Sequence, residues 1–325
     1  MAAVDHPINP RLRPADALRT PRFSGVRTFM RLPHLESARG VDLTIVGVPF
    51  DTGASFRVGA RFGPAAIRAA SVLLKPYAFE QGVDIFSRRG AADLGDVAVV
   101  PGYIEESFGR ITEGLSAVLN EAAVPFVLGG DHSILLPELR AVAARHGPVG
   151  LLQFDSHTDT WDEFFGQKYN HGTVVRRAIE EELIRPDRSI QVGIRGSLYA
   201  PADVDDARGL GLDVVPMMDV RRLGLPALGR RIRDRLGDAP AFLSFDIDFI
   251  DPAYAPGTGT PQVGGPASWE ALVLLQECAG LRFVACDVVE VIPAYDPSEI
   301  TALAAAQVVH ECMALVAGRV PGTNA

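Results

Sequence analysis

Four short apolar segments of this chain run directly into acidic residues or histidine. They occupy residues 125–128, 149–152, 241–245 and 283–289 and are rich in the aliphatic and phenylalanine side chains of buried strands. Strands buried on both faces belong to parallel sheets covered by helices, and ligands bind beyond the carboxyl ends of such strands. The pattern therefore predicts an α/β fold in which the residues that follow the four segments meet at one edge of a parallel sheet.

Helical and extended patterns alternate along the rest of the chain, which is typical of βαβ units. No linker, repeat or low-complexity run interrupts them after residue 40. We therefore predict a single catalytic domain, residues 41–320, behind a proline- and arginine-rich N-terminal arm, residues 1–40. The expected strands are 42–48, 126–129, 149–155, 189–195, 212–216, 241–248 and 283–290, and the expected helices are 65–74, 105–122, 134–145, 172–183, 227–236, 269–278 and 298–316.

The composition narrows the class of protein. A net charge of -9 argues against a nucleic-acid-binding surface, which is normally basic. Three cysteines without a CxxC pair indicate free thiols in a reducing compartment. No segment approaches the ~18 uncharged apolar residues of a spanning helix, and the N-terminus has no apolar core of a secretory signal. We predict a cytoplasmic protein without nucleic-acid or membrane partners.

The residues after the second segment, 154–160, read FDSHTDT. Alternate side chains of an extended chain share a face, so Asp155, His157 and Asp159 are expected to project together. Buried carboxylates need a compensating charge, and a divalent metal is the simplest one. A solvated strand end is the alternative for this motif taken alone. Six residues of suitable type follow the apolar segments: His132, Asp155, His157, Asp159, Asp246 and Asp248.

These candidate ligands are more than one tetrahedral zinc ion requires. Two ions that share bridging carboxylates suit them better, and a donor set of mostly oxygen with some imidazole and no thiolate favours manganese over zinc. A metal pair lowers the pKa of bound water toward about 7, as hydrolysis of a guanidinium requires. Glu290, which follows the fourth segment, matches a guanidinium by paired hydrogen bonds, and an exposed strand-end acid is the alternative for it.

Several motifs together resemble the ureohydrolase (arginase/agmatinase) family, and within it the agmatinase and guanidinobutyrase-type members. They are GGDHS at 129–133, FDSHTDT at 154–160, HGT at 171–173 and, most specific of all, SFDIDFIDPAYAPGTGTP at 244–261. The segments PFDTGASFRVGARFGPAAIR at 49–68 and PAYDPSEITALAAA at 293–306 are also agmatinase-like. The resemblance covers roughly residues 20–317.

The resemblance implies a three-layer α/β/α sandwich around a mainly parallel eight-stranded sheet, a trimer or hexamer, and two Mn²⁺ ions per chain, with Ni²⁺ as the alternative. Activated water would attack the guanidinium carbon, giving urea and a primary amine. Asp159 matches the carboxylate that relays a proton to the amine, His171 a proton-exchanging histidine, and Glu290 the acid that holds the guanidinium. One ion would take His132, Asp155, Asp159 and Asp246, and the other His157, Asp155, Asp246 and Asp248.

The loop between the FDSHTDT motif and His171 bears on the substrate. Arginases carry a Ser-Gly-Asn segment there that holds the carboxylate of an amino acid, whereas this chain has WDEFFGQKYN at 161–170. Arginine is therefore disfavoured as the substrate. The loop has two acids, Asp162 and Glu163, and one lysine, Lys168, which favours a substrate with a cation at the end remote from the guanidine. We predict agmatine, converted to putrescine in polyamine biosynthesis. The alternatives are a guanidinobutyrase- or guanidinopropionase-type substrate or an alkylguanidine. For Trp161, packing in the core is the alternative to a place in the site.

Two other classes of protein compete with this hypothesis. A non-catalytic paralogue would be expected to lack a ligand, whereas all six positions, His171 and Glu290 are filled. A zinc amidohydrolase of the same broad fold, acting on acetylated amines, would need only one mononuclear site. Ser156 stands where the family more often has alanine, and its side chain is expected to face away from Asp155 and His157.

Overall fold

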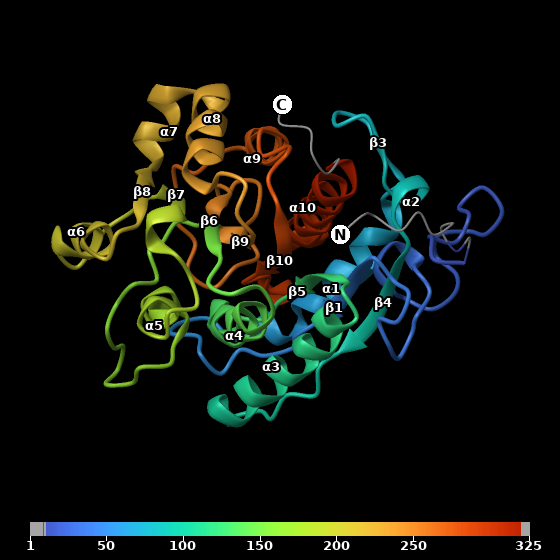
Figure 1. Cartoon of the computed structure of the whole chain (residues 1–325), viewed down its shortest axis with the longest axis horizontal. Helices are drawn as coiled ribbons and strands as arrows, with labels where there is room; N and C mark the ends of the chain where they lie inside the picture. Colours follow the sequence, from blue (N-terminus) through green and yellow to red (C-terminus); the bar gives the residue numbers. More distant parts are fainter. Residues whose placement is uncertain (1–8, 10, 320–325) are drawn as a thin grey trace.

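The computed structural model describes residues 9 and 11–319 of the 325-residue chain. An eight-stranded parallel sheet, in the order β4-β1-β5-β10-β9-β6-β7-β8, lies at its centre with helices on both faces (Figure 1). The prediction of a three-layer α/β/α sandwich is thus confirmed. The strands of this sheet are β1 (Leu43–Gly47), β4 (Ala91–Asp96), β5 (Val124–Leu128), β6 (Gly150–Phe154), β7 (Ile190–Ile194), β8 (Asp213–Pro216), β9 (Ala241–Asp246) and β10 (Phe283–Val289), and a separate antiparallel pair is β2 (Tyr77–Ala78) and β3 (Val83–Asp84).

The helices form two layers. α3, α4 and α5 pack in sequence along one face of the sheet, and α1, α10, α9 and α8 pack in sequence along the other (Figure 1). Alternate residues of each strand supply the two cores: Leu151 of β6 lies in the α3–α4–α5 core and Leu152 in the opposite one. The helices are α1 (Gly63–Ala70), α2 (Ile85–Arg88), α3 (Ile104–Asn120), α4 (Leu135–His146), α5 (Val174–Glu180), α6 (Ala202–Gly209), α7 (Met217–Leu223), α8 (Leu225–Leu236), α9 (Ser268–Gln276) and α10 (Ile300–Gly318).

The four strands that carry the predicted site are neighbours in the middle of the sheet, in the order β5-β10-β9-β6. Their register brings the carboxyl ends level, because Leu128 pairs with Val288, Val289 with Asp246, and Phe245 with Phe154. Parallel strands expose these ends at the same edge. The residues that follow the four strands therefore meet at one place, as the sequence predicts.

The sequence analysis did not predict the edge strand β4 or the helices α6 and α7. β4 reads AADLGD, which lacks the β-branched run of a central strand and ends in charge. The N-terminal segment packs on this edge: Phe29 is fully buried, and its N–H donates to Asp93 Oδ2 at 2.8 Å. The boundary between arm and catalytic domain at residue 40 stays a prediction.

One described helix, Pro297–Gly318, is long and apolar enough to cross a membrane by length and composition. The expectation that no segment approaches a spanning helix is therefore wrong by this measure. Within the molecule 72% of its most apolar window is buried, and α10 packs against α1, α9 and β10. This burial is that of a core helix. Cys278, Cys286 and Cys312 are buried free thiols, as expected.

Candidate active site

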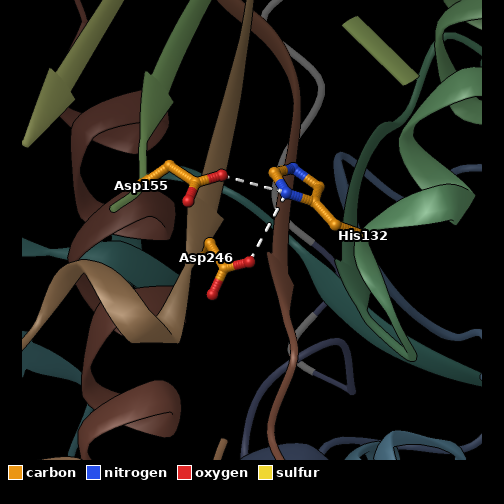
Figure 2. Close-up of side chains that lie close together, drawn as sticks. All are labelled: His132, Asp155 and Asp246. Atoms are coloured by element: carbon orange, nitrogen blue, oxygen red, sulfur yellow. Dashed lines mark ion pairs between the residues drawn. The ribbon is translucent and has the colours of Figure 1, made fainter. Parts of the chain in front are cut away.

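The first cluster of candidate ligands brings together residues that follow three different strands. His132 Nδ1 lies 3.1 Å from Asp155 Oδ2 and 3.4 Å from Asp246 Oδ2, with all three side chains buried (Figure 2). Asp159 Oδ2 approaches the same nitrogen at 2.9 Å. Imidazole nitrogen and carboxylate oxygens converging in this way form a possible metal site.

A second cluster adjoins the first and shares Asp155 with it. His157 Nδ1 lies 3.0 Å from Asp248 Oδ2 and 3.6 Å from Asp155 Oδ1. The two oxygens of Asp155 therefore face different clusters, which is the placement of a bridging carboxylate. Asp246 also touches both clusters: its Oδ2 faces His132 in the first, and its Oδ1 accepts the N–H of Asp248, a residue of the second, at 2.8 Å.

The side chains converge by a different route from the one expected. β6 ends at Phe154, and the chain then turns: Asp155 Oδ1 accepts the His157 N–H at 2.7 Å, and Asp159 has a positive φ of 52°. Asp248 likewise lies in a short 3₁₀ helix, Ile247–Phe249. The expectation of an extended chain is wrong here, because the carboxylates bind their own backbone amides and tighten both segments into turns.

The hydrogen bonds of His132 fix its tautomer. Ser244 Oγ donates to Asp287 Oδ1 at 2.8 Å and lies 2.9 Å from His132 Nε2. The hydroxyl therefore accepts the Nε2–H, which leaves Nδ1 with a lone pair directed at three carboxylates. Nδ1 is buried and has no hydrogen-bond partner. A lone pair among carboxylates is stable only if a cation lies between them, so these residues fit a bound metal ion.

The charge balance of the clusters supports the same fit. Burial and the charges of Asp248 and Asp155 raise the pKa of Asp246 well above its usual value. Burial would also raise the pKa of Asp155, but the adjacent rings of His132 and His157 hold it far below the usual range. Asp248 Oδ2 is buried without a hydrogen-bond partner. A concentration of buried carboxylates of this kind requires positive charge.

Ser156 does not face away from the site, contrary to expectation. Its Oγ donates to Asp248 Oδ1 at 2.7 Å and lies 3.1 Å from His157 Nδ1. Its N–H also donates to Asp248 Oδ1, at 3.1 Å. The turn after β6 rotates the side chain toward the second cluster, where it holds the Asp248 carboxylate in place.

Glu290 and His171 form a buried pair beside the first cluster. Glu290 Oε1 accepts the His132 N–H and contacts His171 Nδ1, both at 2.9 Å. Its Oε2 is buried and has no hydrogen-bond partner. Glu290 has a positive φ of 66°, a strained conformation for a non-glycine residue that is commonest at functional sites. The exposed strand-end alternative for Glu290 is wrong.

Glu290 and Ser55 contact opposite nitrogens of the His171 ring and favour different protonation states of it. Burial lowers the pKa of His171, but the adjacent Glu290 carboxylate outweighs this and raises it to about 9. The Ser55 N–H donates to Nε2 at 3.2 Å, and Ser55 Oγ lies 2.7 Å from the same atom. An amide donor at Nε2 favours a ring with its proton on Nδ1. The ring is thus held between an acid and a serine.

Several supporting residues were missed in the sequence. Gln153 Nε2 donates to Asp155 Oδ2 at 2.7 Å, and Ser244 and Asp287 orient His132. Gln153 and Ser244 precede a candidate ligand by two positions on their strands, and Asp287 is a charge inside an apolar run. Alternation along a strand was the available signal. Ser55 lies in a glycine-rich loop far away in the sequence, and no pattern there predicts that it contacts the site.

Comparison with known proteins agrees with the motifs. Residues 41–315 match the arginase family. The guanidinobutyrase of Pseudomonas aeruginosa is 42% identical over 92% of this chain and 94% of its own length. The mitochondrial agmatinase of Gallus gallus is 46% identical over 90% of this chain and 86% of its own length.

A solved structure gives the same answer at the level of the fold. The proclavaminate amidino hydrolase of Streptomyces clavuligerus superposes with a TM-score of 0.89 and 41% identity, over 92% of this chain and 99% of the other. The eight-stranded sheet, the paired clusters and these similarities lead to one assignment. This chain belongs to the arginase family.

Proposed function

We propose that this chain is an agmatinase-type ureohydrolase, which hydrolyses agmatine to urea and putrescine at a centre of two Mn²⁺ ions. The observation that carries the proposal is the pair of clusters joined through Asp155, next to a buried glutamate with one unpartnered oxygen. Water oxygen adds to the guanidinium carbon, the bond from that carbon to the alkyl-bearing nitrogen breaks, and the amine leaves with a proton.

The ions would be held by the two clusters. The first offers one imidazole and three carboxylates, and the second one imidazole and two carboxylates. These are hard donors without sulfur, which suits manganese better than zinc. When bound, such ions acidify a water from a pKa of about 15.7 toward 7 and so supply the nucleophile. The residues would be His132, Asp155, Asp159 and Asp246 for one ion and His157, Asp155 and Asp248 for the other, with Asp246 shared by both ions as the family resemblance implies.

Glu290 would hold the guanidinium. Its Oε2 is an unpartnered acceptor in a buried setting, where a charge-assisted hydrogen bond is strong. A side chain at Gly259 would come within 3.2 Å of this oxygen, so the glycine keeps the approach to it open. Glu290 is not itself among the residues that line the cavity above the clusters, whereas its partner His171 is. The guanidinium would therefore pass His171 to reach it.

Asp159 and His171 would manage the protons. Burial and the nearby Asp155 charge raise the pKa of Asp159, which makes that carboxyl a better proton carrier than an exposed aspartate. Both residues line the cavity. Asp159 would pass a proton to the leaving amine, and His171, which lies nearer to solvent than Glu290, would exchange protons with bulk water.

A second substrate class has a specific basis. The guanidinobutyrase of P. aeruginosa matches this chain about as well as the agmatinase does, so 4-guanidinobutyrate is the alternative to agmatine. Cytoplasmic localisation and a trimeric or hexameric assembly stay predictions from the sequence.

Urea release tests the proposal directly. We expect the manganese-loaded protein to release urea from agmatine with a higher kcat/KM than from 4-guanidinobutyrate, 3-guanidinopropionate or arginine at matched concentrations. A large preference for another guanidine would refute the substrate and leave the reaction standing. Absence of urea from every guanidine would refute the reaction itself.

A further inference from the structure

The cavity above the two clusters of candidate ligands extends to a rim near the protein surface. It has a volume of about 460 Å³ and is lined at its base by Asp159 and Asp246 and farther out by Trp161, Tyr199 and Asp203. Of the two loops at the rim, one follows β6, the other follows β7 and leads into the first turn of α6, which carries Asp203, and β6 and β7 pair in the sheet. Residues of the clusters and of the rim thus line one and the same cavity.

Aromatic side chains form the walls near the rim. The Trp161 ring stacks on Phe164 at 5.1 Å and 14° and contacts Tyr199 at 5.5 Å. Phe165 packs edge-on against Phe164 at 4.5 Å. Phe165 and Tyr199 are 76% and 78% exposed, so the protein itself does not cover these rings. Trp161 thus faces the cavity rather than the core, and the rim offers free aromatic faces to a ligand.

The loop charges that suggested a cationic tail lie elsewhere. Asp162 pairs with Arg177 at 2.6 Å, and neither it nor Glu163 lines the cavity. Lys168 lines a separate surface groove. No lysine or arginine occurs among the described residues that line the cavity, and Asp203 is its one acid outside the ligand clusters. The charge in the cavity therefore still favours a cationic tail, but it comes from Asp203 of α6 and not from the loop after β6.

Asp203 is held in place by the loop before it. Its Oδ2 accepts the Tyr199 N–H at 2.9 Å and the Ala200 N–H at 3.4 Å. Both bonds use the same oxygen, and none of the described side chains pairs with Oδ1. One oxygen thus fixes the loop before α6 at Tyr199 and Ala200, while the other remains for a ligand.

We propose that Trp161, Tyr199 and Asp203 form a subsite that selects substrates by a cationic group at the end remote from the guanidine. An ammonium is attracted to aromatic faces and to a carboxylate, whereas a carboxylate tail would lose water, find no cation and meet the like charge of Asp203. This inference rests on the proposed function. It assigns the choice between agmatine and 4-guanidinobutyrate to the loop after β7 as well as the loop after β6.

Asp203→Asn is the decisive variant, because the amide oxygen still accepts the two backbone N–H groups and only the charge is lost. The substrates are agmatine, butylguanidine and 4-guanidinobutyrate, which share a four-carbon chain and differ in the charge at its end. We expect kcat/KM for agmatine to fall about fivefold, mainly through KM, as for a partly exposed charge pair. The value for butylguanidine should stay within about twofold, and that for 4-guanidinobutyrate should rise.

Two controls separate recognition from structure. Asp206→Asn removes the same charge from an exposed position of α6 that does not line the cavity, and it should leave all three values unchanged. Asp203→Glu should recover part of the preference for agmatine. Tyr199→Leu keeps apolar area but removes an aromatic face, and should weaken agmatine more than butylguanidine.

An equal loss for agmatine and butylguanidine in Asp203→Asn would overturn the inference, since Asp203 would then only support the loop. A wild-type preference for 4-guanidinobutyrate would overturn it while guanidine hydrolysis stands. If no guanidine releases urea, the proposed function fails, and calorimetric titration of the manganese-loaded protein with agmatine and 4-guanidinobutyrate still decides the subsite. Tighter agmatine binding that weakens in Asp203→Asn would support it, and equal binding would refute it.

Discussion

Asp155→Ala is expected to lose both metal ions and at least about 10³-fold in urea release, because one side chain serves both clusters. Asp155 Oδ2 faces His132 and Oδ1 faces His157. Removal of the bridge leaves each cluster one ligand short. Metal analysis after dialysis, alongside the urea assay, measures both effects in the same sample.

Asp162→Ala is the matched control for this variant. Asp162 lies on the same loop, but its carboxylate pairs with Arg177 at the surface and belongs to neither cluster. This control should retain the metal content and the activity of the wild type. Circular dichroism of Asp155→Ala should show a folded protein. Full metal content in folded Asp155→Ala protein would contradict the bridging role.

Glu290→Gln is expected to lower kcat/KM by about 10²- to 10³-fold while leaving the metal content unchanged. The substitution keeps an oxygen that can accept the His132 N–H, but it removes the charge that matches the guanidinium, and the loss of one partner from a buried charged pair costs about 3–5 kcal/mol. Glu290 belongs to neither cluster, so the ions should stay. Concurrent loss of metal would assign Glu290 to the metal centre instead.

The same variant has a pH signature in the metal-free protein. Because Glu290 raises the pKa of His171 from 6.5 to about 9, the pair stabilises the fold fully below 6.5 and loses this contribution as the pH rises through about 9. The free energy of unfolding of the wild type should therefore fall across this window by more than that of Glu290→Gln. Urea denaturation of both proteins at the two ends of the window measures the difference. Equal slopes would show that the acid and the ring are not coupled.

The sequence was sufficient to predict seven strands of the sheet and the residues that converge in the two clusters. β5, β6, β9 and β10 are apolar runs with Asp, His or Glu at or shortly after their ends, and physical rules for parallel sheets already place such ends at one edge. The apolar pattern predicts seven strands, and only the family resemblance implies an eighth. β4 escaped because an edge strand needs less apolar sequence than a central one.

The local geometry could not be predicted in the same way. Asp155 and Asp246 bind backbone amides two residues ahead, and this turns segments that alternation alone would leave extended. The turn also points Ser156 at Asp248 rather than away from it. Side-chain orientation beyond a strand end depends on such hydrogen bonds, which no spacing rule encodes.

The proposed subsite for the cationic end of the substrate could not be predicted from the sequence either. Asp203 stands among other acids in the segment Ala202–Gly209, ADVDDARG, where nothing distinguishes it from surface charge. Its role depends on the pairing of β6 with β7, which brings two loops to the same cavity. Residues that act together only through tertiary contact require the structure.

Hydrolysis is proposed to depend on ions held by two adjacent clusters that Asp155 joins. Titration of metal-free protein with Mn²⁺, with bound metal and urea release measured at every step, tests this dependence most directly. The account predicts that activity reaches its plateau at two ions per chain. A plateau at one ion, or urea release by the chelated protein at the wild-type rate, would contradict it.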